Sequence, residues 1–128
     1  MEDEIFGKVI HSYTRADAIA DGVLVDLSGR YPEEAGQLYK WPVACTAAVW
    51  ALVEAAVAYG LGNDYDGVVW DILWMSQKFI IKRIDDYQHL FEVSITGTGA
   101  ARHRVLKIVS HPGDDGLPVL TIMLPEES

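Results

Sequence analysis

The residues best suited to chemistry are four histidines and one cysteine, and they are widely spaced along the chain. The histidines are His11, His89, His103 and His111. No two stand four positions apart, the spacing that puts two imidazoles on one helix face, so we predict no metal site and no cofactor. Cys45 precedes an expected helix, where a thiol can become nucleophilic. Because no histidine is identifiable as its base, a buried apolar cysteine is the stronger interpretation.

Two tryptophans form the most prominent aromatic pair. Trp70 and Trp74 are four residues apart and therefore share one face of an expected helix, with Asp71 beside them. Such a pair either belongs to a helix that is buried on most sides or forms an exposed ridge, since tryptophan is enriched where proteins bind each other. A second aromatic group of candidate contact residues comprises Tyr31, Tyr39 and Trp41. We predict both groups as partner-binding residues.

The charge balance limits the class of partner. Nineteen acidic residues stand against ten basic ones, for a net charge of −9. Binding to nucleic acid or to an anionic membrane requires an excess of lysine and arginine, so we expect neither. The same charge suits a basic protein partner, and it also serves simply to keep a small protein soluble.

The length and the termini indicate one cytoplasmic domain. A chain of 128 residues with half of them hydrophobic fits a single domain, 1–128, with a sizeable core. The start, Met1-Glu2-Asp3-Glu4, is acidic where a signal peptide is basic, and the single cysteine allows no internal disulfide. Residues 42–61 carry only one charge, but they are rich in alanine, so we expect a core helix rather than a membrane span.

The first half of the chain predicts a strand and several helices. A strand is expected within residues 5–13. Thr14 can cap a short helix, with Asp17 as the second half of a capping box and Gly22 as the stop. Residues 23–25 suit a strand or a buried connection, residues 28–32 a loop, and residues 33–39 one or two helical turns after Pro32.

Two longer helices should follow, and then strands. Thr46 can cap a helix that runs to about residue 59, and a third helix is expected over residues 68–82, capped at Asp66. Val69, Ile72, Leu73, Ser76, Phe79 and Ile80 form its apolar stripe. Apolar residues then alternate within 91–95, 106–108 and 120–124, separated by glycine-rich turns. We therefore predict an α+β fold, with three main helices on one face of an antiparallel sheet that includes a C-terminal three-stranded meander.

One segment bears a weak resemblance to an enzyme fold. Residues 10–24 (IHSYTRADAIADGVL) resemble the opening of ADP-ribosyltransferase-like folds, in which a strand with a His-x-Thr motif binds the nicotinamide ribose of NAD. The resemblance implies that His11 and Thr14 would be the site residues. Thr14 stands three positions after His11 rather than two, and the helix is shorter than in that family.

Four blocks resemble a family of small proteins of unknown function from phages, plasmids and other bacterial mobile elements. The blocks are residues 10–26 (IHSYTRADAIADGVLVD), 39–50 (YKWPVACTAAVW), 70–75 (WDILWM) and 113–125 (GDDGLPVLTIMLP). The resemblance implies an accessory role, such as interference with a host defence system, and names no catalytic residues.

Three functions remain open at this point. The first is a non-enzymatic module that binds another protein, and it rests on the charge, the aromatic residues and the lack of a clustered catalytic set. The second is an NAD or nucleotide binder with His11 and Thr14 at its site. The third is a structural subunit of an oligomeric assembly.

Overall fold

The computed structural model describes residues 13–97 and 103–128. The helices in these ranges are α2 (Arg15–Ala20), α3 (Leu27–Arg30), α4 (Pro32–Leu38), α5 (Ala47–Tyr59) and α6 (Tyr65–Lys78). The strands are β1 (Leu24–Asp26), β2 (Val43–Thr46), β3 (Ile80–Arg83), β4 (Gln88–Ser94), β5 (His103–Pro112) and β6 (Pro118–Met123). The strand expected within residues 5–13 falls, apart from Tyr13, outside the described residues, and so does His11.

The fold is α+β, as predicted, but its sheet is mixed. The six strands lie in the order β1-β2-β6-β5-β4-β3. The meander is confirmed, because β4, β5 and β6 are consecutive antiparallel neighbours. The expectation of an antiparallel sheet is wrong at one pair, since β2 runs parallel to β6. The sequence hides β2 because its four residues run directly into α5 and are too few to show an alternation of their own.

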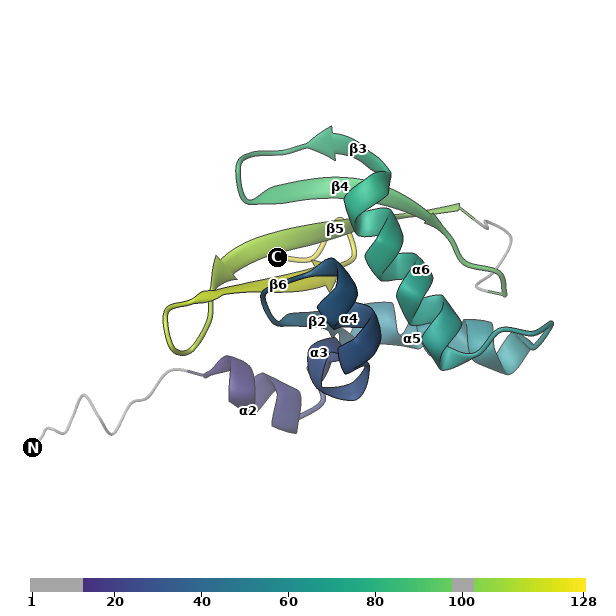
Figure 1. Cartoon of the computed structure of the whole chain (residues 1–128), viewed down its shortest axis with the longest axis horizontal. Coiled ribbons are helices and arrows are strands. Elements are labelled where there is room, and N and C mark those ends of the chain that lie inside the picture. The colour runs from purple at the N-terminus through teal and green to yellow at the C-terminus, as the bar shows by residue number, and fades with distance from the viewer. Residues whose placement is uncertain (1–12, 98–102) are drawn as a thin grey trace, which may run out of the picture.

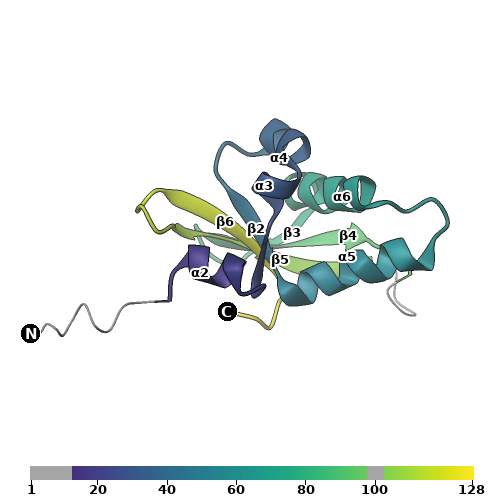
Figure 2. The ribbon, with the colours of Figure 1, turned by 90° about the horizontal axis from the view of Figure 1, so that it is seen from below.

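The helices cover both faces of the sheet. Figure 2 shows α3, α4 and α6 on one side and α2 on the other, while α5 packs against α6 and against β1, β2 and β6. The prediction that all helices share one face is therefore wrong for α2. Arg15 of α2 donates to Thr121 Oγ1 at 2.8 Å, and Thr121 alternates along β6 with Ile122 of the core.

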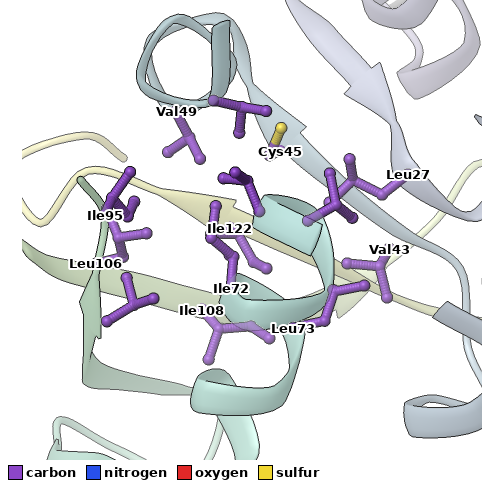
Figure 3. Close-up of a cluster of buried hydrophobic side chains, with 14 of the residues drawn as sticks. Leu27, Val43, Cys45, Val49, Ile72, Leu73, Ile95, Leu106, Ile108 and Ile122 are labelled. Carbon is purple, nitrogen blue, oxygen red and sulfur yellow. The ribbon is translucent and has the colours of Figure 1, made fainter. Parts of the chain in front are cut away.

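The main core lies between the sheet and helices α5 and α6 (Figure 3). Alternate residues of the meander point into it, as their spacing predicts: Phe91 and Val93 of β4, Leu106 and Ile108 of β5, and Ile122 of β6 are all buried. The helices contribute side chains at helical spacing: Val49, Val53 and Ala56 from α5, and Val69, Ile72 and Leu73 from α6. Burial of these faces is the main force that holds the layers together.

Local caps start the helices where the sequence indicates them. Thr14 accepts from the Asp17 backbone N–H at 3.0 Å, and the Asp17 carboxylate accepts from the Thr14 backbone N–H at 3.1 Å, which completes the predicted capping box. Thr46 likewise accepts from the N–H of Val49 and begins α5. Gly22, with φ of 79°, ends the turn after α2 as expected.

One loop of the prediction is a helical turn. Residues 28–32 are expected to be loop, but α3 occupies Leu27–Arg30. Asp26 starts this turn, because its carboxylate accepts from the backbone N–H of Gly29 at 3.0 Å. A single turn of four residues is too short to show a helical hydrophobic period, so its cap is the only sequence signal for it.

The helix predicted over residues 68–82 is displaced toward the N-terminus and is α6. It begins at Tyr65 because Asp64, rather than Asp66, caps it: Asp64 Oδ1 accepts from the Gly67 backbone N–H at 2.7 Å. It ends at Lys78, and the chain then turns into β3.

The early end of α6 also corrects its predicted apolar stripe. Val69, Ile72, Leu73 and Ser76 are buried as expected. Phe79 and Ile80 are instead 55% and 43% exposed. Ile80 pairs with Phe91 of β4, and the two adjacent β-branched isoleucines, Ile80 and Ile81, favour a strand over a further helical turn.

The burial of α6 can be tested with two identical substitutions. Leu73→Ala should lower the free energy of unfolding by about 2–5 kcal/mol, because the side chain is fully buried and the packed core closes only partly around the space left. Leu61→Ala is the control, since Leu61 is 81% exposed, and it should change the stability by less than about 0.5 kcal/mol. Urea unfolding measures both, and equal losses would contradict the placement of α6.

Candidate functional site

The outer face of α6 carries the predicted tryptophan pair. Trp70 and Trp74 stack with ring centroids 5.6 Å apart, and Lys78 Nζ lies 5.1 Å from the centroid of the Trp74 ring. Trp74 is 38% exposed, while Trp70 is partly buried. These three residues are spaced by four and form one stripe along the helix, on the side away from the buried Ile72 and Leu73.

Asp71 lies at the surface next to this stripe, three residues before Trp74. Partial burial raises the pKa of its carboxyl. A carboxylate at the margin of an aromatic surface can accept hydrogen bonds from a partner, which is the role predicted for it. The structure thus brings together Trp70, Asp71 and Trp74 on one solvent-facing side of α6.

The exposed apolar surface continues beyond α6 into β3. Phe79, Ile80, Ile81 and Ile84 are 55%, 43%, 53% and 45% exposed. Figure 1 shows β3 at the outer edge of the sheet, with the last turn of α6 leading into it. The sequence pattern predicts Phe79 and Ile80 in the buried stripe of a longer helix, so the exposure of these four residues was not predicted. The signal that could have revealed them is the run of β-branched residues at 80–81.

We call this region the α6–β3 surface: Trp70, Asp71, Trp74 and Lys78 of α6, and residues 79–84. It carries three cations, Lys78, Lys82 and Arg83, within six positions. The chain as a whole is acidic, with ten lysines and arginines in 128 residues. Residues 78–84 of the α6–β3 surface therefore combine apolar side chains with positive charge, whereas Trp70 at the other end lines a hollow together with Glu33, Glu34, Asp64 and Asp66.

The second predicted aromatic group is spread over different settings. Tyr31 contacts the Trp50 ring at a centroid distance of 6.2 Å. The hydroxyl of Tyr39 lies 2.6 Å from Ser76 Oγ, which itself donates to the Leu73 carbonyl, so Tyr39 donates to Ser76. These contacts tie Tyr31 and Tyr39 into the packing of the helices.

Trp41 is placed apart from both tyrosines. Lys40 Nζ lies 5.0 Å from the centroid of the Trp41 ring. The Trp41 side chain lines a hollow of about 350 Å³, which lies between α2 and the β5–β6 turn and is also lined by Arg15 and Leu117. All three residues of this group are partly buried, and their contact with a partner stays a prediction.

The second face of the sheet holds a groove of about 910 Å³. Its walls come from α2, from β5 and β6, from the start of α5, and from the C-terminal residues Glu127 and Ser128. Thr14, the described residue of the predicted nucleotide site, lines this groove, whereas His11 lies outside the described residues. The groove therefore contains the described part of the predicted NAD or nucleotide site.

The central polar groups of the groove are engaged with one another. Arg15 donates from Nη1 to Thr121 Oγ1 at 2.8 Å and from Nη2 to the Leu120 carbonyl at 2.8 Å. His111 Nε2 lies 2.9 Å from the same Thr121 oxygen. Because the Thr121 hydroxyl has a second lone pair beside the one that accepts from Arg15, it can either accept from His111 Nε2 or donate to it, according to the imidazole tautomer. Burial and the charge of Arg15 lower the pKa of His111.

The start of α2 is occupied as well. The carboxylate of Asp114, in the β5–β6 turn, accepts from the backbone N–H groups of Arg15 and Ala16 at 2.8 and 3.0 Å. Thr14 accepts the next free N–H, that of Asp17. The donors at this helix start that could bind a phosphate therefore already have partners. These contacts hold α2 against the sheet, and we call them the α2 junction.

Cys45 and the possible metal-ligating side chains are further reactive groups within residues 13–97 and 103–128. Cys45 is buried in β2, and burial raises the pKa of its thiol to about 12. In the same ranges, no three His, Cys, Asp or Glu side chains are grouped so that they could hold a metal ion. No helix in the described part of the chain is both long and apolar enough to cross a bilayer.

Comparison with known proteins places the chain in a family. A family model described as "Family of unknown function (DUF6573)" matches residues 4–128. The chain belongs to the DUF6573 family. No curated protein and no solved structure matches it. The function of this DUF6573 protein is therefore inferred from its own surface and contacts.

The His111 contact predicts a dependence of stability on pH. The pKa of His111 in the folded protein lies below its ordinary value of 6.5, so the unfolded chain takes up the proton first. His111 therefore contributes stability that is complete above about pH 6.5 and is lost as the pH falls through the folded pKa. His111→Gln should flatten the decline in thermal midpoint between about pH 7 and 5. His103→Gln, at an exposed histidine, is the control, and an unchanged decline in His111→Gln would count against the α2 junction.

The burial of Cys45 predicts an unreactive thiol. In the native protein at pH 8, Ellman's reagent should release almost no thiolate, because the thiol is both buried and protonated. In guanidinium chloride one thiol per chain should react rapidly. Rapid reaction without denaturant would show instead that β2 opens readily or that the cysteine is accessible.

Proposed function

We propose that this DUF6573 protein is a non-enzymatic module that binds another protein through the α6–β3 surface. The observation that carries the proposal is the group of exposed aromatic and aliphatic side chains at Trp74, Phe79, Ile80, Ile81 and Ile84. Monomeric proteins seldom leave such a patch uncovered, and patches rimmed by polar residues usually mark interaction sites. Tryptophan and arginine, both present here, are the residues that most often dominate binding energy.

The arrangement of the polar groups supports a binding role over catalysis. Arg15, His111 and Thr121 are engaged with one another, and Asp114 occupies the start of α2. Cys45 is buried with a raised pKa. An enzyme needs at least one activated group exposed to substrate, and the described polar clusters supply contacts within the fold instead.

The charge of the surface refines the expected partner. The net charge of −9 by itself favours a basic partner. At the α6–β3 surface, however, Lys78, Lys82 and Arg83 favour acidic groups on the side of the partner that makes the contact. The family resemblance adds a setting, an accessory role in phage or plasmid biology in which the module blocks part of a host or defence protein.

The proposal predicts that Trp74 is a binding residue. In a tagged pull-down from lysate of the native host, the wild-type protein should retain one stoichiometric protein. Trp74→Ala should weaken this binding on the order of 30-fold, the loss of about 2 kcal/mol expected at an energetically dominant contact. Its thermal midpoint should fall by less than half as much as that of Leu73→Ala, since Trp74 is partly exposed.

The matched control is Tyr59→Ala, which removes a ring that is 58% exposed on α5 and outside the α6–β3 surface. It should leave the captured protein unchanged. Equal capture by the Trp74 and Tyr59 variants would show that the α6–β3 surface is not the contact. If nothing is captured and millimolar NAD raises the thermal midpoint, the nucleotide-binding alternative takes its place.

A further inference from the structure

The two edges of the sheet differ in how far they are covered. At one edge, β1 has only three residues, its central Val25 is buried, and α2 and α5 both contact it. At the other edge, every residue of β3 is exposed. Among the described residues β3 pairs only with β4 (Figure 1). The sheet therefore has a single accessible edge in the part of the chain that the structure describes.

The exposed edge is held in a strand conformation. Its two ends are fixed to β4, because the Glu92 N–H donates to the Phe79 carbonyl at 3.1 Å and the Ile84 N–H donates to the Gln88 carbonyl at 2.9 Å. In an antiparallel pair, alternate N–H and C=O groups of an edge strand point away from its neighbour. An incoming strand would therefore find donors and acceptors already in position, with little ordering of β3 required.

The side chains of β3 select the kind of strand that can pair there. Ile81 and Ile84 offer apolar contact, while Lys82 and Arg83 add two positive charges. Across neighbouring strands, opposite charges attract and like charges repel. A second copy of the chain would bring its own Lys82 and Arg83 to the same edge, so self-pairing is disfavoured. An acidic strand meets complementary charges.

Of the two carboxylates in the β3–β4 turn, Asp85 and Asp86, the first is engaged in the turn itself. It accepts from the Tyr87 backbone N–H at 2.8 Å and from Gln88 Nε2 at 2.9 Å, and these bonds lower its pKa. Asp85 thus shapes the β3–β4 turn, and its oxygens are directed to that turn. The register shift between Ile80 and Lys82 and the two cations also discourage indiscriminate strand pairing, which is how edge strands are usually protected.

We infer that β3 binds an extended segment of another protein, in which Asp or Glu alternates with Val, Ile or Leu, as an added strand of the sheet. This inference rests on the proposed protein-binding function and specifies its mode. Main-chain hydrogen bonds to β3 supply the affinity, and the apolar side chains of the added strand lie on the α6 side of the sheet, beside Ile80. The acidic side chains of the segment lie on the opposite face of the added strand, the face of Lys82, whose partner Leu90 alternates along β4 with the core residue Phe91.

The test uses two synthetic peptides with capped ends and identical length. One repeats Glu-Val and the other Lys-Val, each over eight residues, and each is titrated into the full ¹⁵N-labelled chain. The Glu-Val peptide should shift the amide resonances of residues 80–84 and slow their hydrogen exchange. It should bind at least tenfold more tightly than the Lys-Val peptide, and added salt should reduce the difference.

Charge reversal at the edge provides the specificity control. Lys82→Glu should weaken the Glu-Val peptide and strengthen the Lys-Val peptide, because it places a negative charge opposite the added strand. Lys40→Glu makes the same change of charge at an exposed lysine outside the α6–β3 surface and should alter neither affinity. Equal effects of the two substitutions would mean that net charge, rather than the β3 edge, determines binding.

The outcomes separate this inference from the proposed function. If millimolar peptide leaves residues 80–84 unshifted while capture of the host protein still depends on Trp74, strand addition is overturned and the binding role stands. If the chain alone is a dimer by sedimentation with protected β3 amides, the occupant of the edge is a second copy, which also overturns the inference. Loss of capture in both Lys82→Glu and Trp74→Ala, with Lys40→Glu unaffected, supports it.

Discussion

The pairing of β2 with β6 joins the two halves of the chain into one sheet. Val43, Ala44 and Cys45 lie beside Leu120, Thr121 and Ile122 in parallel register, and all three β2 residues are almost fully buried. The Leu120 N–H also donates to the Pro42 carbonyl at 2.8 Å. Because β1 is attached to the sheet only through β2, this parallel contact carries the edge strand and the start of α5 with it. The positions of β1 and the start of α5 relative to the meander therefore depend on it.

The pairing of β2 with β6 also positions polar groups on the second face of the sheet. With β2 beside β6, α2 lies on the second face of the sheet, and Arg15 reaches Leu120 and Thr121. The C-terminal residues return over this face, where the Glu127 carboxylate accepts from Thr46 Oγ1 at 2.8 Å. A small domain has few polar groups to spare, and here the described ones on this face connect elements distant in the chain.

The α6–β3 surface arises because the core is complete without it. One side of α6 buries Ile72 and Leu73 against the sheet, and the opposite side retains the tryptophans. The chain then leaves the helix at Phe79 and adds β3 outside the area that α6 covers. The apolar side chains of β3 therefore stay exposed to solvent. In the proposed binding mode, a partner strand would pair with this exposed edge, and the cations on it would favour an acidic strand.

The sequence by itself determined what depends on neighbouring residues: the caps at Thr14 and Thr46, the alternation of the meander strands, and the shared helix face of Trp70 and Trp74. It also contains no two histidines at the four-residue spacing of a helical metal site, and its two most closely spaced tryptophans are Trp70 and Trp74. The tertiary structure alone decided that β2 exists, that α2 lies on the second face, and that α6 gives way to β3 at Phe79. These features depend on hydrogen bonds and burial between segments far apart in the chain, such as β2 with β6. Such contacts can outweigh local propensity, and a short apolar run in the sequence does not reveal them.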